Sequence, residues 1–521
     1  GTFFNPNFLA GYLAVSWAIL LSVAVYGYRR AAAPPWLSFS PALWWCGVVA
    51  SLCSLFLAVL FTQSRGGMIV VLVATAFIVM VRYGWKWAGS CLVVLTLCGL
   101  LIPTPLRERV LAEHQQNPVS YARWQMWQGA LTQMVDHPFG IGLGLYQYTY
   151  PRYAFPVEGE IARYGKVAQT PHNDYLQMGV EMGGGAMVVV AIGVLMVGRE
   201  FRQVLQARLS RRQRSLMLGI GGGGIALLVH AALDSSLRES ALAILLVLSV
   251  GLMMSAGRLT NHGTAVQHAV PIRSRWAWGI GVAVLLLVVG LDLMRLGMAW
   301  MTFDSASRRA VAGETDSAIH GLQSAIAWDP GKSLYHHGLG SVYARVFETS
   351  REQEAFRLAH AEFKAAIELN PLDSRLLGLL AQLYVSAAQS PSGLADSLEQ
   401  RKGWLRAAVR VYERASQLAP FSAPYRYEQA RLHWMLGERA EAEQHAKKAE
   451  RLEPNFLPAR ALLARLWMDQ GQVDDAKHEL QEIQSRQDRY KQWNKNSIDQ
   501  AFLNVDVTAL RAAVHEKEVA G

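Results

Sequence analysis

Charged residues are scarce in this sequence. Only 17% of its 521 residues are Asp, Glu, Lys or Arg, whereas an average soluble protein has about 25%. The shortage is confined to residues 1–295, which hold 22 basic and 11 acidic residues, while residues 296–521 hold 28 and 29. The net charge of +10 therefore divides into +11 and −1. This composition excludes a uniformly soluble chain and predicts two different kinds of domain.

A basic domain surface is also missing. A pI near 9.4 favours nucleic-acid binding only when a folded domain carries a basic face. Here the basic excess lies between apolar runs, which is typical of loops that flank membrane helices. We therefore expect a lipid bilayer among the partners and no nucleic acid.

Cysteine is rare, and its pattern argues against disulfides and structural zinc. The sequence has no Cys-x-x-Cys pair and no Cys/His cluster, and its four cysteines lie inside apolar runs: Cys46, Cys53, Cys91 and Cys98. Such a pattern is typical of buried thiols.

Eight stretches are long and apolar enough to cross a membrane, since about 20 residues span the hydrocarbon core and shorter helices suffice inside a bundle. They are residues 8–27, 42–61, 66–81, 87–102, 174–197, 216–233, 240–256 and 276–295. No basic region precedes the first apolar stretch, so we expect no signal peptide in this sequence. We also expect that further spans precede Gly1 in the complete protein.

The basic loops alternate along these spans. Four of them hold 13 basic residues and one acidic residue: the loop at Arg29 and Arg30, the turn at Arg82 and Lys86, the run Arg199–Arg214, and the loop with Arg258, Arg273 and Arg275. Lys and Arg accumulate on the cytoplasmic side. One orientation satisfies all four loops, and it predicts that the remaining loops and everything after residue 296 lie outside the cytoplasm.

The long loop 103–173 falls on that outer side. Loops of this length in a compact protein are usually functional. It contains an amphipathic stretch, residues 121–135, with Trp124, Trp127, Leu131 and Met134 at helical spacing, followed by Pro138–Gly144. We interpret the aromatic stripe as interfacial packing rather than a ligand site.

After residue 296 the sequence repeats as helical pairs. Successive units end at Pro330, Pro371, Pro420 and Pro454, and the last spacing is 34 residues, the length of a tetratricopeptide repeat. Gly437 and Gly471 fit places where packed helices approach closely. The pattern predicts four or five repeats over residues 296–490, forming a right-handed solenoid that binds a protein partner, and a helical tail over 491–521. The fold class is therefore all-α throughout.

Three outer-side regions carry candidate chemistry. Arg65 lies beside Gly66 and Gly67 at the start of an apolar helix, where a guanidinium and a helix N-terminus suit an anion; the alternative is an arginine that only reaches the interface. His172 stands where the long loop re-enters the membrane, and its imidazole could accept a hydroxyl proton. Asn173 and Asp174 fit a helix cap and a first-turn acid.

The third region follows the sixth span. His230, Asp234 and Arg238 are spaced i, i+4 and i+8, which predicts one face of a helix that leaves the membrane. A hydrogen bond between His230 and Asp234 could be structural or catalytic. Glu158 and Glu160 in the long loop could hold a divalent ion, but paired carboxylates in polar loops are usually solvated. We expect neither a metal ion nor a cofactor.

Several of these motifs, in this order, resemble the O-antigen ligase superfamily, which includes lipopolysaccharide O-antigen ligases, O-linked oligosaccharyltransferases and O-antigen polymerases. The motifs are Gly1–Gly11, Ser64–Gly67, Arg123–Trp127, Pro138–Gly144, and His172–Asn173 followed by Gly183. The resemblance covers about residues 1–260. The sequence departs from the family pattern at Ala186, where the pattern has Gly, Thr or Tyr.

The resemblance implies a glycosyltransferase C-like membrane bundle over residues 1–295. It implies that Arg65 and Arg123 bind the diphosphate of a polyprenyl-linked glycan donor and that His172 acts at the acceptor. From their positions in the sequence, we expect Asn173, Asp234 and Arg238 to support the site. The expected activity is metal-independent, inverting glycan transfer at the periplasmic face of a bacterial inner membrane, to a lipid, protein or polysaccharide hydroxyl. The alternatives are a non-catalytic scaffold that anchors the repeats and a transporter of lipid-linked glycans.

Overall fold

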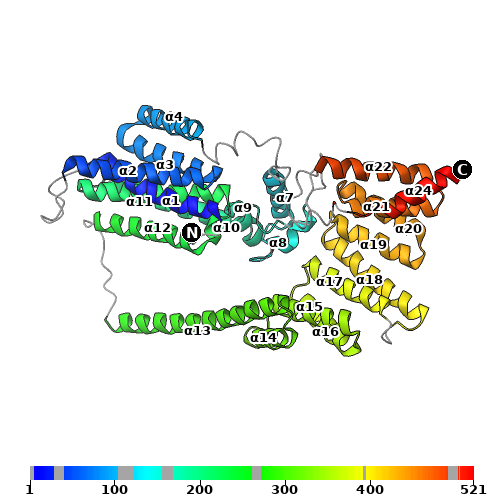
Figure 1. Ribbon diagram of the computed structural model, residues 1–521. Coiled ribbons are helices and arrows are strands. Elements are labelled where there is room, and N and C mark those ends of the chain that lie inside the picture. The colour runs from blue at the N-terminus through cyan, green and yellow to red at the C-terminus, as the bar shows by residue number, and fades with distance from the viewer. Residues whose placement is uncertain are drawn as a thin grey trace. The chain divides into compact units, whose positions relative to one another are not determined.

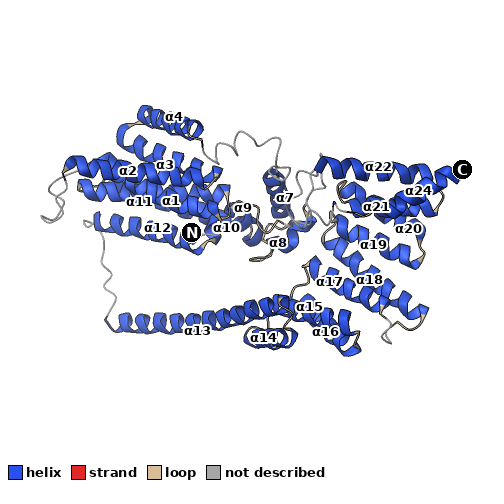
Figure 2. Cartoon of the chain, in the orientation of Figure 1, coloured by secondary structure: helices blue, strands red, loops and turns tan. Residues whose placement is uncertain are grey.

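The protein is all-α. The computed structural model describes residues 5–27, 40–103, 122–154, 168–260, 272–390, 395–490, 503 and 505–520, and every regular element in them is a helix (Figure 2). The fold class predicted from the sequence is confirmed. The chain forms two compact units, which are described separately below. Arg29, Arg30, Glu158 and Glu160 lie outside the described residues.

Unit 1 consists of Gly1–Gln147 and Ala168–Gln267. Its helices are α1 (Pro6–Tyr26), α2 (Pro41–Phe61), α3 (Arg65–Tyr83), α4 (Trp85–Leu101), α7 (Ala122–Asp136), α9 (Asp174–Met182), α10 (Gly184–Gln206), α11 (Arg211–Leu233) and α12 (Ser240–Thr260), with the 3-10 turn η4 (Ser236–Arg238). The short helix α8 (Tyr146–Thr149) lies at its border with unit 2. Helix α1 packs against both α3 and α11 (Figure 1).

Six helices in the described part of the chain are long and apolar enough to cross a membrane: Pro6–Tyr26, Pro41–Phe61, Arg65–Tyr83, Gly184–Gln206, Arg211–Leu233 and Trp276–Val311. Two shorter apolar helices, Trp85–Leu101 and Ser240–Ala256, coincide with the other stretches found in the sequence. The stretch predicted as one span over 174–197 is two helices, because α9 ends at Met182 and α10 begins at Gly184.

The break between α9 and α10 has a steric cause. Gly183 has φ +82, and a Cβ there would lie 2.6 Å from the Pro138 carbonyl oxygen. Gly140 has φ +86, and its Cβ would lie 2.5 Å from the Glu181 carbonyl oxygen. The two backbones cross with no space for side chains, and Gly184 N donates to Pro138 O at 3.1 Å. The Pro138–Gly142 segment thereby packs directly against the break between α9 and α10.

Helices α1, α3 and α11 each have one end near basic residues and one end near the candidate site. Arg82, at the end of α3, lies over the ring of Tyr26 at 5.4 Å, and a Cβ on Gly27 would meet the guanidinium of Arg211 at 3.7 Å. The opposite ends of the same helices carry Asn7, Arg65 and Asp234. Arg82 and Arg211, which belong to two of the four basic loops, therefore lie at the same end of this bundle.

Glycines allow α1 and α11 to pack closely. A Cβ on Gly219 would lie 2.9 Å from the Cα of Ile19, and a Cβ on Gly223 would lie 3.1 Å from a Val15 methyl group. Ala14 and Ala18 of α1 are fully buried in the same core. The glycine run that weakens the helix locally thus permits backbone contact, as small residues do between membrane helices.

Unit 2 contains Tyr148–Val167 and His268–Gly521. Its helices are α13 (Ile272–Val311), α14 (Thr315–Trp328), α15 (Ser333–Ser350), α16 (Gln353–Leu369), α17 (Ser374–Gln389), α18 (Leu398–Leu418), α19 (Ala423–Leu436), α20 (Arg439–Leu452), α21 (Leu457–Asp469), α22 (Val473–Tyr490) and α24 (Thr508–Ala520), with the 3-10 turn η3 (Tyr150–Arg152). Consecutive helices pair as α15 with α16, α17 with α18, α19 with α20, and α21 with α22 (Figure 1).

The first repeat is continuous with an apolar helix. Helix α13 is 40 residues long and runs without a break across residue 295, where the sequence predicts the domain boundary. Its apolar side chains from Trp276 to Met294 are exposed in the protein, as side chains that face lipid would be. The end of α13 packs on α14 through Ala306, Ala318 and Leu322.

The glycine contacts generate a prediction. Gly219→Ala should destabilise unit 1 by about 1–3 kcal/mol, because the new methyl group overlaps the Ile19 backbone, which cannot rotate away. Gly224→Ala, on the same helix, is the matched control, since the nearest atom to its Cβ is 3.8 Å away. Thermal unfolding in detergent measures both. Equal Tm values for the two variants would contradict the packing described here.

Candidate functional site

His172 stands at the entry to α9 in a strained backbone conformation. Its φ is +52, a region that non-glycine residues rarely occupy and that is common at functional sites. The next residue, Asn173, caps α9 by accepting hydrogen bonds from Tyr175 N at 3.0 Å and Leu176 N at 3.1 Å. The predicted cap is confirmed, and it fixes the backbone directly after the histidine.

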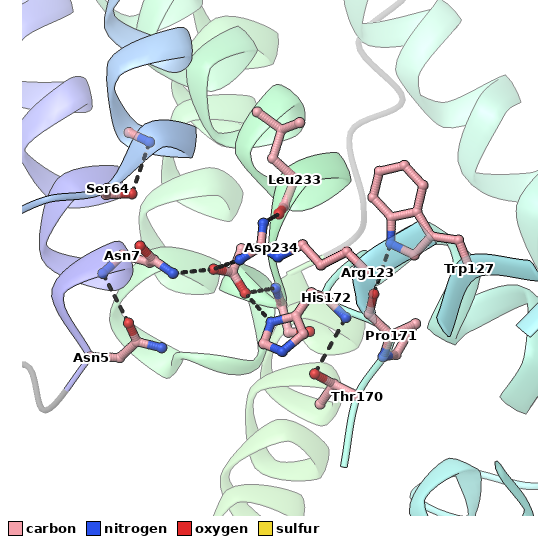
Figure 3. Close-up of polar contacts among 12 residues, drawn as sticks. Asn5, Asn7, Ser64, Arg123, Trp127, Thr170, Pro171, His172, Leu233 and Asp234 are labelled. Carbon is pink, nitrogen blue, oxygen red and sulfur yellow. Dashed lines mark hydrogen bonds and ion pairs between the residues drawn. The ribbon is translucent and has the colours of Figure 1, made fainter. Parts of the chain in front are cut away.

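Asp234 is the acceptor around which the site is arranged (Figure 3). It is 3% exposed and follows the last residue of α11. Its Oδ1 lies 2.9 Å from His172 Nδ1 and accepts from Ser235 N at 2.8 Å. Its Oδ2 accepts from Asn7 Nδ2 at the start of α1. One carboxylate thus joins α1, α11 and the loop before α9.

Arg123 of α7 approaches the same carboxylate. Its Nη1 donates to Leu233 O at 2.9 Å, and its Nη2 lies 3.6 Å from Asp234 Oδ2. The Arg123 side chain is 46% exposed, so part of its guanidinium faces solvent. Trp127, one turn further along α7, donates from Nε1 to Pro171 O at 2.8 Å (Figure 3). Helix α7 therefore contacts both the end of α11 and the residue before His172, and Trp127 forms a specific hydrogen bond in addition to any packing role.

The electrostatics define the tautomer of His172. Burial raises the pKa of Asp234, but hydrogen bonds from His172 and Ser235 and the nearby positive charges outweigh it and lower the pKa to about 2. The carboxylate is therefore ionised and can only accept, so Nδ1 of His172 carries the proton. In the neutral imidazole Nε2 therefore holds the lone pair, and the side chain is 40% exposed. This arrangement is suited to a general base with a carboxylate that orients it.

Arg65 is the first residue of α3 and is exposed. Ser64 caps the helix by accepting from Gly67 N at 3.0 Å. The position of a Cβ on Gly66 lies 3.7 Å from the Leu233 Cβ, and Leu233 is the residue whose carbonyl accepts from Arg123. The start of α3 therefore lies next to the end of α11. Gln63, before the cap, has φ +58, a second strained position at this end of the bundle.

The prediction for His230, Asp234 and Arg238 was wrong in its geometry. Helix α11 ends at Leu233, Asp234 is extended with φ −156 and ψ 172, and Arg238 ends a separate 3-10 turn. The three residues therefore do not share a helix face. No side-chain hydrogen bond joins His230 to Asp234; their contact is Asp234 N to His230 O at 2.9 Å. The histidine that pairs with Asp234 is His172.

Asn7 is a site residue for which the sequence predicts no role. Its contact with Asp234 joins positions 227 residues apart, so no local pattern could reveal it. The signal that was present is the capping sequence Asn5-Pro6-Asn7, in which Asn5 accepts from Asn7 N at 2.9 Å. That bond fixes the first turn of α1 and leaves the Asn7 side chain available to Asp234.

The sequence comparisons agree with this picture. Residues 49–191 match the family described as O-antigen ligase, and residues 433–495 match the tetratricopeptide repeat. The first match includes Arg65, Arg123 and His172, whereas Asn7 and Asp234 lie outside it. No curated protein is significantly similar to the chain.

Three solved structures illustrate the structural similarities. A thermophilic tetratricopeptide-repeat protein of Thermus thermophilus is 20% identical, with 42% of this chain and 99% of that chain covered and a TM-score of 0.30. A MamA protein is 16% identical, with 38% and 97% covered and a TM-score of 0.29. MamA of Desulfovibrio magneticus is 14% identical, with 38% and 98% covered and a TM-score of 0.29.

Six of the described helices are long and apolar enough to cross a membrane, and the match over residues 49–191 makes this region similar to the O-antigen ligase family. The chain carries an O-antigen ligase domain followed by tetratricopeptide repeats, as its motifs predict. The repeats are modules for binding protein partners.

A second carboxylate near the site gives a pH prediction. Burial raises the pKa of Asp174 to about 6, above its ordinary 3.8, although Leu237 N donates to it at 2.8 Å. The folded state therefore holds this proton more tightly than the unfolded state. The resulting stabilisation, about 3 kcal/mol, is complete below pH 4 and is lost as the pH rises through 6.

Asp174→Asn, which keeps the acceptor for Leu237 N, should remove that pH dependence between pH 4 and 6. The measurement is the Tm of the detergent-solubilised protein across this range. Asp136→Asn, at the exposed end of α7, is the control and should behave as wild type. Parallel curves for wild type and Asp174→Asn would contradict the buried-acid assignment.

Proposed function

We propose that this protein transfers a glycan from a polyprenyl diphosphate carrier to an acceptor hydroxyl at the outer face of the bacterial inner membrane. The observation that carries the proposal is the His172–Asp234 pair beside Arg123. An imidazole oriented by a carboxylate and a partly exposed guanidinium stand together at one end of a membrane bundle. That combination suits an acceptor that must lose a proton and a donor that must lose an anionic group.

The reaction balances without a cofactor. The acceptor oxygen attacks the anomeric carbon as its proton passes to Nε2 of His172, and the bond from that carbon to the diphosphate oxygen breaks. The carrier diphosphate leaves with the electron pair. Attack opposite the leaving group inverts the anomeric centre. Asp234 would stabilise the imidazolium that forms, as the carboxylate of a catalytic triad does.

Arg65 and Arg123 are proposed to hold the diphosphate. A guanidinium presents paired donors that fit phosphate oxygens, and the negative charge that develops on the leaving group is stabilised by donors already in place. Arg65 adds the N-terminus of α3, where the positive end of the helix dipole favours anions. The polyprenyl chain would lie along the apolar helices, with the diphosphate at the aqueous edge.

The proposed orientation rests on charge. Arg82 and Arg211 lie at one end of the α1, α3 and α11 bundle, and Arg65, His172 and Asp234 lie at the other. Because basic residues accumulate on the cytoplasmic side, the site would face the periplasm. The repeats would face the same side and bind a protein partner there.

A scaffold without catalysis would have no need of the convergence at Asp234, and a transporter would need polar groups along its path through the membrane. In the described part of unit 1, the buried ionisable residues belong to α9, which follows His172, and to the end of α11: Asp174, Glu181, His230 and Asp234. This distribution favours chemistry at the membrane surface.

The donor assignment is tested by Arg65→Lys and Arg123→Lys. Each change keeps the positive charge but loses the planar fork, and one charge-assisted hydrogen bond contributes about 1.5–3 kcal/mol. Transfer should therefore fall by on the order of ten- to a hundred-fold. The assay incubates the full-length protein with a polyprenyl diphosphate oligosaccharide and candidate acceptors, and mass spectrometry follows the products. Near wild-type transfer by both variants would exclude them as diphosphate ligands.

The base assignment is tested at His172. His172→Ala and His172→Gln should each lower turnover by about 10² to 10⁴-fold while leaving donor affinity unchanged, because glutamine hydrogen-bonds but cannot accept the proton. If the histidine only shapes the turn after Pro171, the glutamine variant should remain active, and that result would refute the proposed base.

Asp234→Asn separates orientation from folding in the same assay. The new amide NH2 would face either His172 Nδ1–H or the Asn7 NH2 group, and in both cases two donors would meet. Turnover should therefore fall, and its pH profile should shift. Asn7→Asp combined with Asp234→Asn restores a donor and acceptor at that contact. The double variant should recover thermal stability but not full turnover, because the carboxylate no longer contacts His172.

A further inference from the structure

A cluster of mainly basic side chains lies between α19 and α20 in the fourth repeat, far from the proposed chemistry in sequence. Helix α19 contributes Arg426, Gln429 and His433 at i, i+3 and i+7, which is one helix face. Helix α20 contributes His445 and Lys448. The rings of His433 and His445 stack with centroids 5.3 Å apart at an interplanar angle of 9°, so the two faces meet.

Three buried atoms in this cluster lack a hydrogen-bond partner: Arg426 Nε, Gln429 Nε2 and His445 Nδ1. The side chain of Gln429 is fully buried, and its Oε1 accepts from Arg426 Nη1 at 3.1 Å. This bond uses the acceptor end of the amide and leaves its donor end unpaired. An unpaired buried donor costs about 1–3 kcal/mol, so Arg426 Nε and Gln429 Nε2 together indicate a missing acceptor. His445 Nδ1 can donate to the same acceptor when it carries a proton.

The charges in the cluster are also unbalanced. Arg426 and Lys448 form no ion pair with any of the described residues. The nearby carboxylate of Glu438 already pairs with His433, since His433 Nδ1 lies 2.6 Å from Glu438 Oε2. The guanidinium of Arg426 lowers the pKa of Lys448, and burial lowers the pKa of Arg426 itself. Burial and the neighbouring positive charges lower the pKa of His445 to about 4, against a small opposite effect of Glu441. An anion would relieve each of these effects.

We infer that the seam between α19 and α20 binds a phosphate-type oxyanion through Arg426, Gln429, His445 and Lys448. A phosphate offers several acceptor oxygens to several donors, and its charge matches a guanidinium and an ammonium side by side. Lys448 is exposed, so the site opens to solvent. This binding site is independent of the proposed glycan transfer, and Arg65, Arg123 and His172 take no part in it.

The test is hydrogen exchange measured by mass spectrometry on the full chain in detergent, with inorganic phosphate compared with sodium chloride at equal ionic strength. At ten times its dissociation constant, phosphate should slow exchange of the α19 and α20 amides about ten-fold where exchange requires release of the ion. Binding should also raise the pKa of His445, which the exchange of its ring C–H measures in the same samples.

Lys448→Gln, a change at an exposed position, should abolish both effects, and so should Arg426→Gln. The matched control is Arg465→Gln on α21, since that guanidinium lies over the Trp434 ring at 5.5 Å and is not part of the cluster; it should respond to phosphate as wild type does. Lys448→Gln should by itself raise the pKa of His445, which verifies that the variant is folded and that the two groups interact.

Three outcomes would overturn the inference: no slowing by phosphate in wild type, equal slowing in Lys448→Gln, or equal slowing by acetate. Vesicles distinguish the source of the phosphate. Slowing by phosphatidylglycerol and by free phosphate, but not by phosphatidylcholine, would support a site that accepts a lipid headgroup as well as a soluble ion. Slowing by phosphatidylglycerol alone would overturn it in favour of general attraction to an anionic surface.

Discussion

The buried carboxylate of Asp234 is the interaction on which the arrangement of the site depends. Three partners, Asn7, His172 and Arg123, reach it from segments that are far apart in the sequence. An isolated buried carboxylate is costly, and these hydrogen bonds and charges keep it ionised at a pKa of about 2. Stability and chemistry are coupled here, because the contacts that make the carboxylate tolerable also orient the imidazole. Removing any one partner would change both.

The bundle around this carboxylate is built to allow close approach. Gly219 and Gly223 bring α11 against α1, which places the end of α11 near Asn7. Gly140 and Gly183 bring the Pro138–Gly142 segment against the joint between α9 and α10. His172 precedes α9 closely, so the angle of that short helix sets the direction from which the histidine approaches Asp234. Small residues far from the chemistry thereby determine its geometry.

The sequence predicted the all-α fold, the repeats and the apolar helices, because each depends on local periodicity. It also proposed Arg65, Arg123 and His172, which belong to short motifs, and their roles stay predictions. The sequence-based prediction was wrong about where helices end. The spacing of His230, Asp234 and Arg238 fits a continuous helix, but Asp234 is extended. The run Gly183–Gly185 gave no sign that only Gly183 has a positive φ, because the backbone contact that requires it comes from residues 138–140. The role of Asn7 could not be predicted for the same reason, because its partner Asp234 is 227 residues away in the sequence.

The uninterrupted helix α13 has a mechanical consequence. At 1.5 Å per residue its 40 residues extend about 60 Å, twice the thickness of a bilayer core of about 30 Å. The segment beyond the apolar stretch is already the first helix of the repeats, so no flexible joint separates anchor from solenoid. The number of residues in α13 therefore fixes the rotation of the repeats about the helix axis relative to the apolar stretch. One residue inserted between the apolar stretch and Ala299 would turn every repeat by about 100°. The direction in which the repeats present their binding face is thus set by the length of one helix.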